Sequence, residues 1–344
     1  MTRSRGKPGS RGSGPSETAS AEVEEHCRQV RAGDRRAVAK AITLLESTRS
    51  DRAGLGQEIL EAVVSETESA IRVGITGPPG VGKSTFIEAV GLHLVERDHR
   101  VAVLAVDPSS PVTGGSILGD KTRMERLSQE EGAFIRPSPS GGALGGVAHR
   151  TREAMLLCEA AGYDVVLIET VGIGQSEISV RSMVDLFAVL LQPGAGDQLQ
   201  GIKKGVLELA DALVVNKGDG EQKAIAERTR GDHVQALQLL RSTSAVWRPP
   251  VLVVSSFTGE GIPAFWEAVL AHREALGASG EFEARRRAQA REWMWALVGE
   301  GLQQAFRRHP EVAGRVTGLE SDVEAQRMTP AAAARILLEA FRGP

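Results

Sequence analysis

The residues that point most directly to chemistry form a glycine-rich run from Gly77 to Thr85, Gly-Pro-Pro-Gly-Val-Gly-Lys-Ser-Thr. A β-rich segment, 71–76, precedes this run, and a stretch with helical spacing, 86–95, follows it. A strand, a glycine loop and a helix in this order form a phosphate-binding loop, because backbone N–H groups and the helix dipole converge on an anion. An ordinary glycine turn does not need this full spacing. The sequence therefore predicts that the chain binds a nucleoside triphosphate.

The polar side chains of this loop have distinct expected roles. Lys83 is expected to reach the β- and γ-phosphates, and the Ser84 hydroxyl is expected to bind Mg²⁺. The predicted phosphate contacts come from nine consecutive residues: Gly77, Pro78, Pro79, Gly80, Val81, Gly82, Lys83, Ser84 and Thr85.

A second motif concerns recognition of the nucleotide's base. The apolar run 212–215 is followed by Asn216-Lys217-Gly218-Asp219, which matches the N-K-x-D pattern of guanine recognition. The Asp219 carboxylate can accept hydrogen bonds from guanine N1–H and from its exocyclic amine, which adenine lacks. Leaving such a buried group unpaired gives discrimination on the order of 10⁴-fold. On its own, such a tetrapeptide is common in turns. After a late strand of a phosphate-binding domain, however, it predicts binding of GTP rather than ATP.

Two further features surround the predicted base site. Asn216 is expected to hold its loop and contact the base, while the stem of Lys217 lies over the base. A Ser-Ser-Phe sequence at 255–257 follows another apolar run, where GTPases keep a loop whose backbone contacts guanine. The predicted base contacts are thus Asn216, Lys217, Asp219, Ser255, Ser256 and Phe257.

Acidic residues near strand ends are candidates for a magnesium site. Asp107 ends one apolar run and Asp120 lies in the loop after it, while Glu169 ends another run, in the position of a Walker B acid. Gly172 follows as a candidate γ-phosphate sensor. A solvated or helix-capping carboxylate is the alternative interpretation of each acid. Because ligands of such folds bind at the carboxyl ends of strands, the predicted Mg²⁺ ligands are Ser84, Asp107, Asp120 and Glu169.

Short apolar runs alternate with helical stretches from residue 71 to about residue 275. Continuous β-branched runs of this kind are typical of buried parallel strands. The predicted strands are 71–76, 101–106, 165–168, 186–191, 212–215 and 251–254. The sequence therefore predicts an α/β fold, a doubly wound and mostly parallel sheet in a P-loop GTPase domain with helical N- and C-terminal extensions.

Composition and periodicity divide the chain into four segments. We expect a disordered tail, an N-terminal helical extension, the P-loop domain and a C-terminal helical arm, with bounds 1–16, 17–69, 70–276 and 277–344. Trp293 and Trp295 lie two residues apart in the arm, so they cannot share one helix face. One of them is expected to face the protein and the other a partner.

The bulk properties exclude several classes of protein. A net charge of −3 disfavours a general nucleic-acid binder. Cys27 and Cys158 are far apart and suit a reducing compartment. No apolar run approaches the roughly 18 residues of a membrane span. We therefore expect a cytoplasmic protein that has neither nucleic acid nor a membrane as a partner.

Two stretches are far more specific than a phosphate-binding loop: GGSILGDKTRM and GAGDQLQGIKKG. Together with LAVDPSS, ETVGIGQSE, NKGD and ARRRAQAREWMW, they closely resemble the MeaB/ArgK family of SIMIBI-class P-loop GTPases, bacterial relatives of the methylmalonic aciduria type A protein. The resemblance covers about residues 27–341. It implies a homodimeric G-protein chaperone that gates adenosylcobalamin loading and protects or reactivates an acyl-CoA mutase, usually methylmalonyl-CoA mutase.

The resemblance also implies roles for individual residues. Lys83, Asp107, Glu169 and Lys203 are the implied catalytic residues. The glycine-rich loop after the run 186–191 resembles a switch loop of the family that responds to the mutase, and the arm resembles its dimerisation element. The implied switch residues are Gly172, Asp197, Gln200 and Lys203.

The expected cofactor is Mg²⁺ with GTP or GDP, and an adenosyltransferase is a further candidate partner. The D-x-H-x-x-G signature of a base-off cobalamin domain is absent from the sequence, so we expect cobalamin to be bound by partners and not by this chain. Isobutyryl-, ethylmalonyl- and hydroxyisobutyryl-CoA mutases fit the resemblance as well as methylmalonyl-CoA mutase does.

Hydrolysis of GTP is expected to depend on positioning of the reacting groups and on electrostatic stabilisation of the charge that develops on the phosphates. Lys83 and Mg²⁺ would neutralise charge at the β–γ bridge, and no residue is an obvious water-orienting glutamine. Turnover is therefore expected to be slow alone and stimulated when the partner brings Lys203 to the nucleotide.

The residues leave two alternative functions open. The first is a GTPase for nickel-enzyme maturation, although two isolated Cys and seven scattered His offer no clustered ligand set. The second is a P-loop kinase, against which the guanine tetrapeptide argues.

Overall fold

The computed structural model describes residues 17–47, 49–64, 70–106, 124–137, 144–170, 176–194, 204–239 and 244–343. The chain forms two compact units, Met1–Phe282 and Glu283–Pro344. The predicted disordered tail, 1–16, lies outside the described residues.

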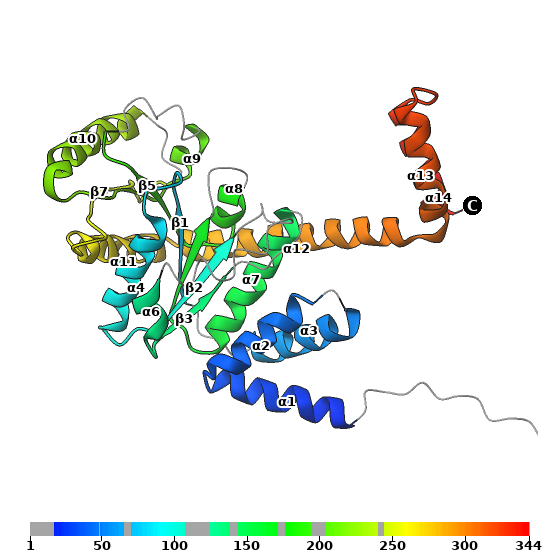
Figure 1. Ribbon diagram of the computed structural model, residues 1–344, viewed down its shortest axis with the longest axis horizontal. Helices are drawn as coiled ribbons and strands as arrows, with labels where there is room; N and C mark the ends of the chain where they lie inside the picture. Colours follow the sequence, from blue (N-terminus) through cyan, green and yellow to red (C-terminus); the bar gives the residue numbers. More distant parts are fainter. Residues whose placement is uncertain are drawn as a thin grey trace, which may run out of the picture. The chain divides into compact units, whose positions relative to one another are not determined.

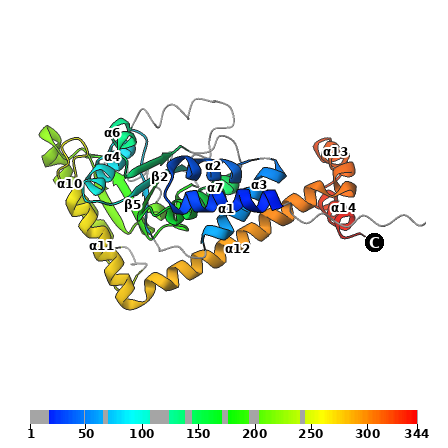
Figure 2. The same cartoon turned by 90° about the horizontal axis from the view of Figure 1, so that it is seen from below.

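Three helices precede the sheet: α1 (Glu17–Arg31), α2 (Arg35–Leu45) and α3 (Ser50–Val64). Asp34 begins α2, because its carboxylate accepts hydrogen bonds from the backbone N–H groups of Arg36 and Ala37 at 2.8 and 2.9 Å. The buried faces of these helices pack together and against α7 (Leu144–Ala160), as Figures 1 and 2 show.

Seven described strands form one parallel sheet in the order β3-β2-β4-β1-β5-β6-β7. Most of these strands are fully buried apolar runs, as a sheet covered on both faces requires. Their bounds are β1 (Ile71–Thr76), β2 (Val101–Val106), β3 (Ala133–Arg136), β4 (Val165–Thr170), β5 (Leu186–Leu191), β6 (Ala212–Val215) and β7 (Val251–Val253).

Helices cover both faces of the sheet, and each face has its own apolar core. One core lies against α4 (Lys83–Val95), α6 (Glu125–Gln129) and α11 (Ile262–Ser279). The other core joins α1–α3 and α7 to α8 (Ser176–Arg181), α9 (Lys204–Glu208) and α10 (Lys223–Leu239), the last preceded by the 3₁₀ turn η3 (Gly220–Gln222). This arrangement confirms the predicted doubly wound α/β fold.

The strand β3 is an addition to the prediction. Its four residues, Ala-Phe-Ile-Arg, are too short a run to stand out in the sequence. They become a strand because they pair with the edge of β2, in a register that sets Val101 beside Ala133.

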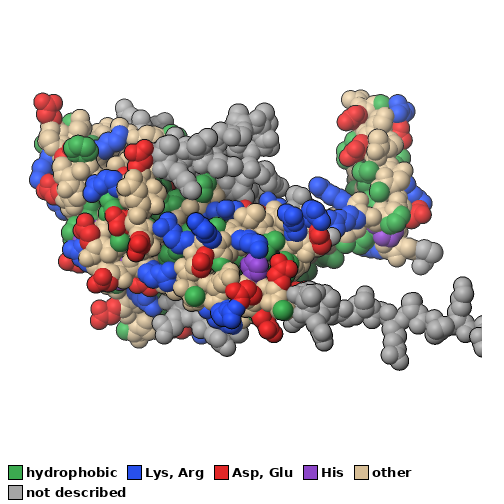
Figure 3. Space-filling model, turned by 60° about the horizontal axis from the view of Figure 1, so that its bottom comes forward, with side chains coloured by type: hydrophobic (Ala, Val, Ile, Leu, Met, Phe, Trp, Pro, Cys, Tyr) green, Lys and Arg blue, Asp and Glu red, His purple; other side chains and the backbone are tan. Residues whose placement is uncertain are grey.

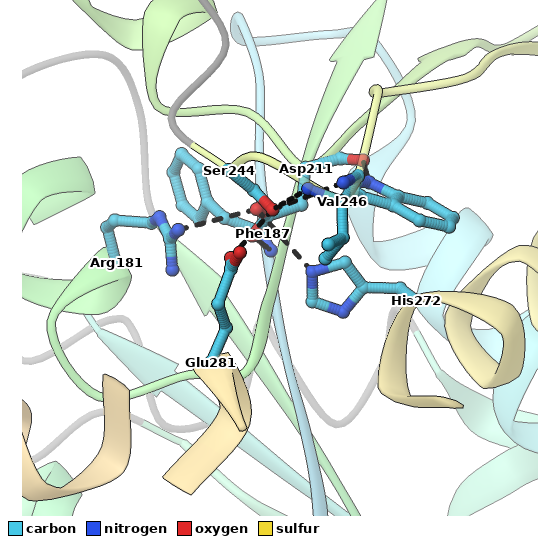
Figure 4. Close-up of polar contacts among 8 residues, drawn as sticks. Arg181, Phe187, Asp211, Ser244, Val246, His272 and Glu281 are labelled. Atoms are coloured by element: carbon cyan, nitrogen blue, oxygen red, sulfur yellow. Dashed lines mark hydrogen bonds and ion pairs between the residues drawn. The ribbon is translucent and has the colours of Figure 1, made fainter. Parts of the chain in front are cut away.

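A buried polar cluster closes the amino end of β6 (Figure 4). The carboxylate of Asp211 accepts a hydrogen bond from the backbone N–H of Phe187 at 2.9 Å and forms an ion pair with Arg181 at 3.3 Å. Its backbone carbonyl accepts a hydrogen bond from the indole N–H of Trp247 at 2.8 Å. These contacts anchor α8 and the segment before β7 to the end of the sheet away from the phosphate-binding loop.

The second unit is helical. It contains most of α12 (Glu281–Arg308), followed by α13 (Pro310–Glu324) and α14 (Pro330–Arg342). The hydroxyl of Thr329 caps α14, and the rings of Phe306 and Phe341 meet edge to face with centroids 5.3 Å apart. Several apolar side chains along α12 are exposed: Met294, Trp295, Leu297, Val298 and Leu302.

One face of the described residues is mixed in charge. Acidic and basic side chains are interspersed on the face seen in Figure 3, in keeping with the net charge of −3. Among the helices that the structure describes, none is both long enough and apolar enough to span a bilayer.

Candidate functional site

The glycine loop lies between β1 and α4, where backbone conformation selects its residues. Gly77, Gly80 and Gly82 have φ values of 152, 78 and 95°, which glycine adopts at little cost. A Cβ atom at Gly77 would lie 2.7 Å from the carbonyl oxygen of Leu190, and one at Gly82 would lie 2.7 Å from the amide nitrogen of Asn216. The loop therefore stays close to the backbone of β5 and to the Asn216 side chain, and larger residues would disturb both contacts.

Lys83, the first residue of α4, folds back over this loop. Its Nζ donates hydrogen bonds to the carbonyl oxygens of Gly77 at 2.9 Å and Pro78 at 3.3 Å. The side chain is nearly buried, with 9% exposure for the residue. The ammonium group is thus held at the loop, where it could exchange carbonyl oxygens for the more strongly attracting oxygens of a phosphate.

The next residue, Ser84, meets an acid from a neighbouring strand. Its hydroxyl donates a hydrogen bond to Oε1 of Glu169 at 3.0 Å, and Glu169 is 6% exposed. Parallel pairing of β1 with β4 sets Ile75 beside Glu169 and so brings the acid to the start of α4. Hydroxyl and carboxylate oxygens are the hard ligands that suit Mg²⁺, so this donor set fits a magnesium site.

Asn216 connects three loops at the carboxyl end of the sheet. Its amide nitrogen donates a hydrogen bond to the carbonyl oxygen of Val81 at 2.9 Å. Its amide oxygen accepts hydrogen bonds from the backbone N–H and the hydroxyl of Ser256 at 3.2 and 2.7 Å. The side chain is 1% exposed. The phosphate-binding loop, the loop after β6 and the loop after β7 therefore share one buried amide.

The two residues after Asn216 have the conformations that this junction requires. Lys217 has a φ of 62°, and its Nζ donates a hydrogen bond to the carbonyl oxygen of Gly80 at 2.7 Å. Gly218 allows close approach to β7, because a Cβ atom there would lie 2.4 Å from Cγ1 of Val253. Asp219 follows with its side chain half-buried, just before η3.

The loop after β7 is closed by hydrogen bonds around Ser255. Its hydroxyl accepts a hydrogen bond from the backbone N–H of Thr258 at 3.1 Å, and its carbonyl accepts one from Gly259 at 2.9 Å. Phe257 stands out from this turn with 89% exposure. Its side chain and the exposed Thr85 line part of a groove of about 310 Å³ between this loop and α4.

The structure brings most of the predicted nucleotide-binding residues to one edge of the sheet. Six predicted site residues lie outside the described part of the chain: Asp107, Asp120, Gly172, Asp197, Gln200 and Lys203. Sequence reasoning did not identify Thr76 and Thr170, whose hydroxyls bond to each other at 2.8 Å beside the site. Their only sequence signal is their position at the ends of two apolar runs.

The chain is similar to known proteins over most of its length. The family model described as methylmalonyl Co-A mutase-associated GTPase MeaB matches residues 38–311. GTPase ArgK of Escherichia coli is 50% identical over 274 residues, which is 80% of this chain and 83% of that protein. The methylmalonic aciduria type A homolog of Mus musculus, described as mitochondrial, is 47% identical over 320 residues, 90% of this chain and 77% of that protein.

A solved structure is similar in fold over nearly the whole chain. The crystal structure of an LAO/AO transport system kinase superposes with a TM-score of 0.74 at 37% identity, covering 94% of this chain and 98% of that chain. These matches confirm the resemblance found in the sequence. Because the family model spans most of the chain and the two relatives cover 80% and 90% of it, the protein belongs to the MeaB family.

Proposed function

We propose that this protein binds GTP with Mg²⁺ at the carboxyl end of the sheet and hydrolyses it to GDP and phosphate. The observation that carries the proposal is the buried Asn216 amide, which joins the phosphate-binding loop to both loops expected to contact guanine. Membership of a family described as GTPases supports it. The site thus has one end suited to phosphates and one suited to the base, held at a fixed separation.

Each part of the proposed site has a role. The residues from Gly77 to Thr85 surround the phosphates, with Lys83 attracting the β- and γ-phosphates. Asp219 selects guanine, and the bonds of Asn216 and Lys217 to the phosphate-binding loop hold the base pocket in place. Base contacts also come from Ser255, Ser256 and Phe257.

The proposed magnesium ligands are Ser84 and Glu169, together with Asp107 and Asp120. Bound Mg²⁺ supplies charge neutralisation at the β–γ bridge. The catalytic residues of the proposal are Lys83, Asp107, Glu169 and Lys203.

The proposed biological role is that of a chaperone for an adenosylcobalamin-dependent acyl-CoA mutase, foremost methylmalonyl-CoA mutase. The family description and the methylmalonic aciduria type A homolog support this link. Nucleotide turnover in the cytoplasm would gate cofactor loading and protect or reactivate the mutase, with an adenosyltransferase as a further partner. Cobalamin stays on the partners, and Gly172, Asp197, Gln200 and Lys203 respond to the mutase.

We further propose that the arm 277–344 forms a homodimer. Its support is the apolar row on α12, in which Met294, Val298 and Leu302 recur at the four-residue spacing of one helix face. Trp295 beside this row is 63% exposed. Leu302→Asp should convert the dimer to a monomer in sedimentation velocity, whereas Gln303→Asp, one residue along, should leave it dimeric. A parent chain that sediments as a monomer would contradict this part of the proposal.

Base selection tests the nucleotide site directly. Calorimetry of the parent protein should show GTP bound far more tightly than ATP. Asp219→Asn should weaken GTP binding and favour xanthosine triphosphate, because an amide can donate a hydrogen bond to the carbonyl that xanthine has at position 2. Glu221→Gln, an exposed substitution in η3, is the matched control. Equal affinity of the parent for ATP and GTP would overturn the proposal.

Coupling to the partner is tested by phosphate release with and without methylmalonyl-CoA mutase. Slow release alone and a large increase on adding the mutase are expected. Lys203→Ala should lose the increase and keep GTP affinity, while Lys204→Ala serves as the neighbouring control. Stimulation of the Lys203 variant equal to that of the parent would remove Lys203 from the mechanism.

The same assays separate the two alternatives. A P-loop kinase would transfer a labelled γ-phosphate to an acceptor instead of releasing it. A nickel-enzyme maturation GTPase would retain nickel in equilibrium dialysis.

A further inference from the structure

Two threonines meet where β1 and β4 end. The Thr170 hydroxyl donates a hydrogen bond to the Thr76 hydroxyl oxygen at 2.8 Å. Both residues are buried, at 0% and 1% exposure. They are the last residues of their strands, and Thr76 immediately precedes the first glycine of the phosphate-binding loop.

This bond lies one position beyond the backbone pairing of the two strands. The β1–β4 register runs from Ile71 beside Val165 to Ile75 beside Glu169. At the next position Thr76 and Thr170 are joined through their side chains. After it, β1 leads into the glycine loop. The hydroxyl pair therefore extends the contact between the strands up to the point where β1 enters the nucleotide site.

The Thr76–Thr170 pair and Glu169 lie on opposite faces of the sheet. Side chains alternate along a strand, so Glu169 points to the α4 face, where it accepts the Ser84 hydrogen bond, and Thr170 points to the other face. There the neighbouring strand positions are Val106 beside Thr170 and Val189 beside Thr76, both fully buried. In such apolar surroundings a hydroxyl that loses its partner is costly.

We infer that Thr76 and Thr170 are positioning residues for the Ser84–Glu169 pair, an inference that rests on the proposed function. Their hydrogen bond holds the end of β4 against the start of the phosphate-binding loop. The Glu169 carboxylate therefore stays within 3.0 Å of the Ser84 hydroxyl. Small displacements of metal-binding side chains weaken a site strongly, because these side chains must return to the binding geometry each time the ion binds.

The test compares removal of one hydroxyl with removal of both. Thr170→Val and Thr76→Val each leave one buried hydroxyl without its partner, so each should lower the melting temperature. The double variant replaces both hydroxyls by apolar groups of the same shape, which is nearly neutral for stability. Its melting temperature should return close to that of the parent. Thr170→Ser keeps the hydroxyl and is the matched control.

The decisive readout is the Mg²⁺ dependence of binding of a fluorescent GDP analogue to the full-length protein. The single and double valine variants should each need about tenfold more Mg²⁺ for half-maximal tightening, because removing a group that orients a metal ligand typically weakens metal binding by about this factor or more. Their nucleotide affinity in excess EDTA should match the parent. Thr170→Ser should show the parental Mg²⁺ dependence.

The outcomes separate this inference from the proposed function. A double variant with both parental stability and parental Mg²⁺ dependence would overturn the inference, since the pair would then only fill the core. If the single variants do not fold, the double variant and Thr170→Ser still decide the result. A parent protein that binds no guanine nucleotide would overturn the proposed function as well.

Discussion

The side-chain amide of Asn216 donates a hydrogen bond to the backbone carbonyl of Val81 at 2.9 Å, across 135 residues of sequence. This bond fastens the loop expected to read the base to the loop expected to hold the phosphates. A site held together before its ligand arrives loses less freedom on binding, which favours affinity.

Asn216→Ala should therefore weaken GTP binding at least about tenfold, because it leaves the buried Val81 and the half-buried Ser256 without these hydrogen bonds. Isothermal titration calorimetry with GTP in excess Mg²⁺ measures this loss. Gln222→Ala, an exposed substitution in η3, is the control and should bind as the parent does. Parental affinity in the Asn216 variant would show that the junction does not support the base pocket.

Gly74 in the middle of β1 lets α8 approach the sheet closely. An added Cβ atom would lie 2.7 Å from Cγ1 of Val180 and 3.1 Å from Cδ2 of Phe187. Gly74→Ala should therefore lower the free energy of unfolding by about 1–3 kcal/mol, because the extra methyl group overpacks the core. Urea unfolding measures the change.

The matched control for Gly74 is Gly231→Ala in α10, where an added methyl group meets nothing within 4 Å. This variant should gain about 0.5–1 kcal/mol, because alanine favours a helix more than glycine does. A Gly74 variant as stable as the parent would show that α8 shifts without cost.

Arg72 and Glu159 form a largely buried ion pair between β1 and α7, with Nε–Oε1 and Nη2–Oε2 distances of 2.6 and 2.8 Å. Their side chains are 14% and 4% exposed. Glu159→Ala removes one partner and leaves the buried guanidinium without its main counter-charge. The expected loss is about 3–5 kcal/mol of unfolding free energy, measured by chemical denaturation.

An exposed ion pair provides the comparison. The side chains of Arg315 and Glu311, which form a contact along α13, are 52% and 61% exposed. Glu311→Ala breaks this contact and should cost about 0–1 kcal/mol, because water screens the charges. Similar losses for the Glu159 and Glu311 variants would contradict the ranking that burial predicts.

Both cysteines are buried, and burial raises the pKa of the Cys27 and Cys158 thiols above their ordinary value of 9.0. Since the thiolate is the reactive form, a raised pKa together with burial should slow modification. Ellman's reagent in mildly alkaline buffer should label neither thiol in the native protein and both after denaturation. Rapid labelling of one thiol in the native state would show local opening around it.

The raised pKa of Cys158 also predicts a pH dependence. The folded protein keeps this proton above pH 9.0, where the unfolded chain releases it, so stability should fall as the pH rises beyond that value. Cys158→Ala should show a shallower decline in alkaline urea titrations than the parent. Equal declines would assign the alkaline loss to other groups.

The local sequence by itself determined the phosphate-binding loop, the guanine tetrapeptide and six of the strands. These features depend on neighbouring residues: glycines at set spacing, a lysine and serine at a helix start, and continuous apolar runs that only a covered parallel sheet can bury. The family could be recognised for the same reason, since its specific stretches are short and contiguous.

Only the tertiary structure decided which distant residues meet. The edge strand β3 exists because β2 offers it a partner, and β4 lies beside β1 because the crossovers set that order. From this order follow the Ser84–Glu169 bond and the Thr76–Thr170 bond, which join residues 85 and 94 positions apart. Parallel pairing links segments across long crossovers, and the register between them is chosen by burial of both sheet faces together. No short stretch of sequence carries that information.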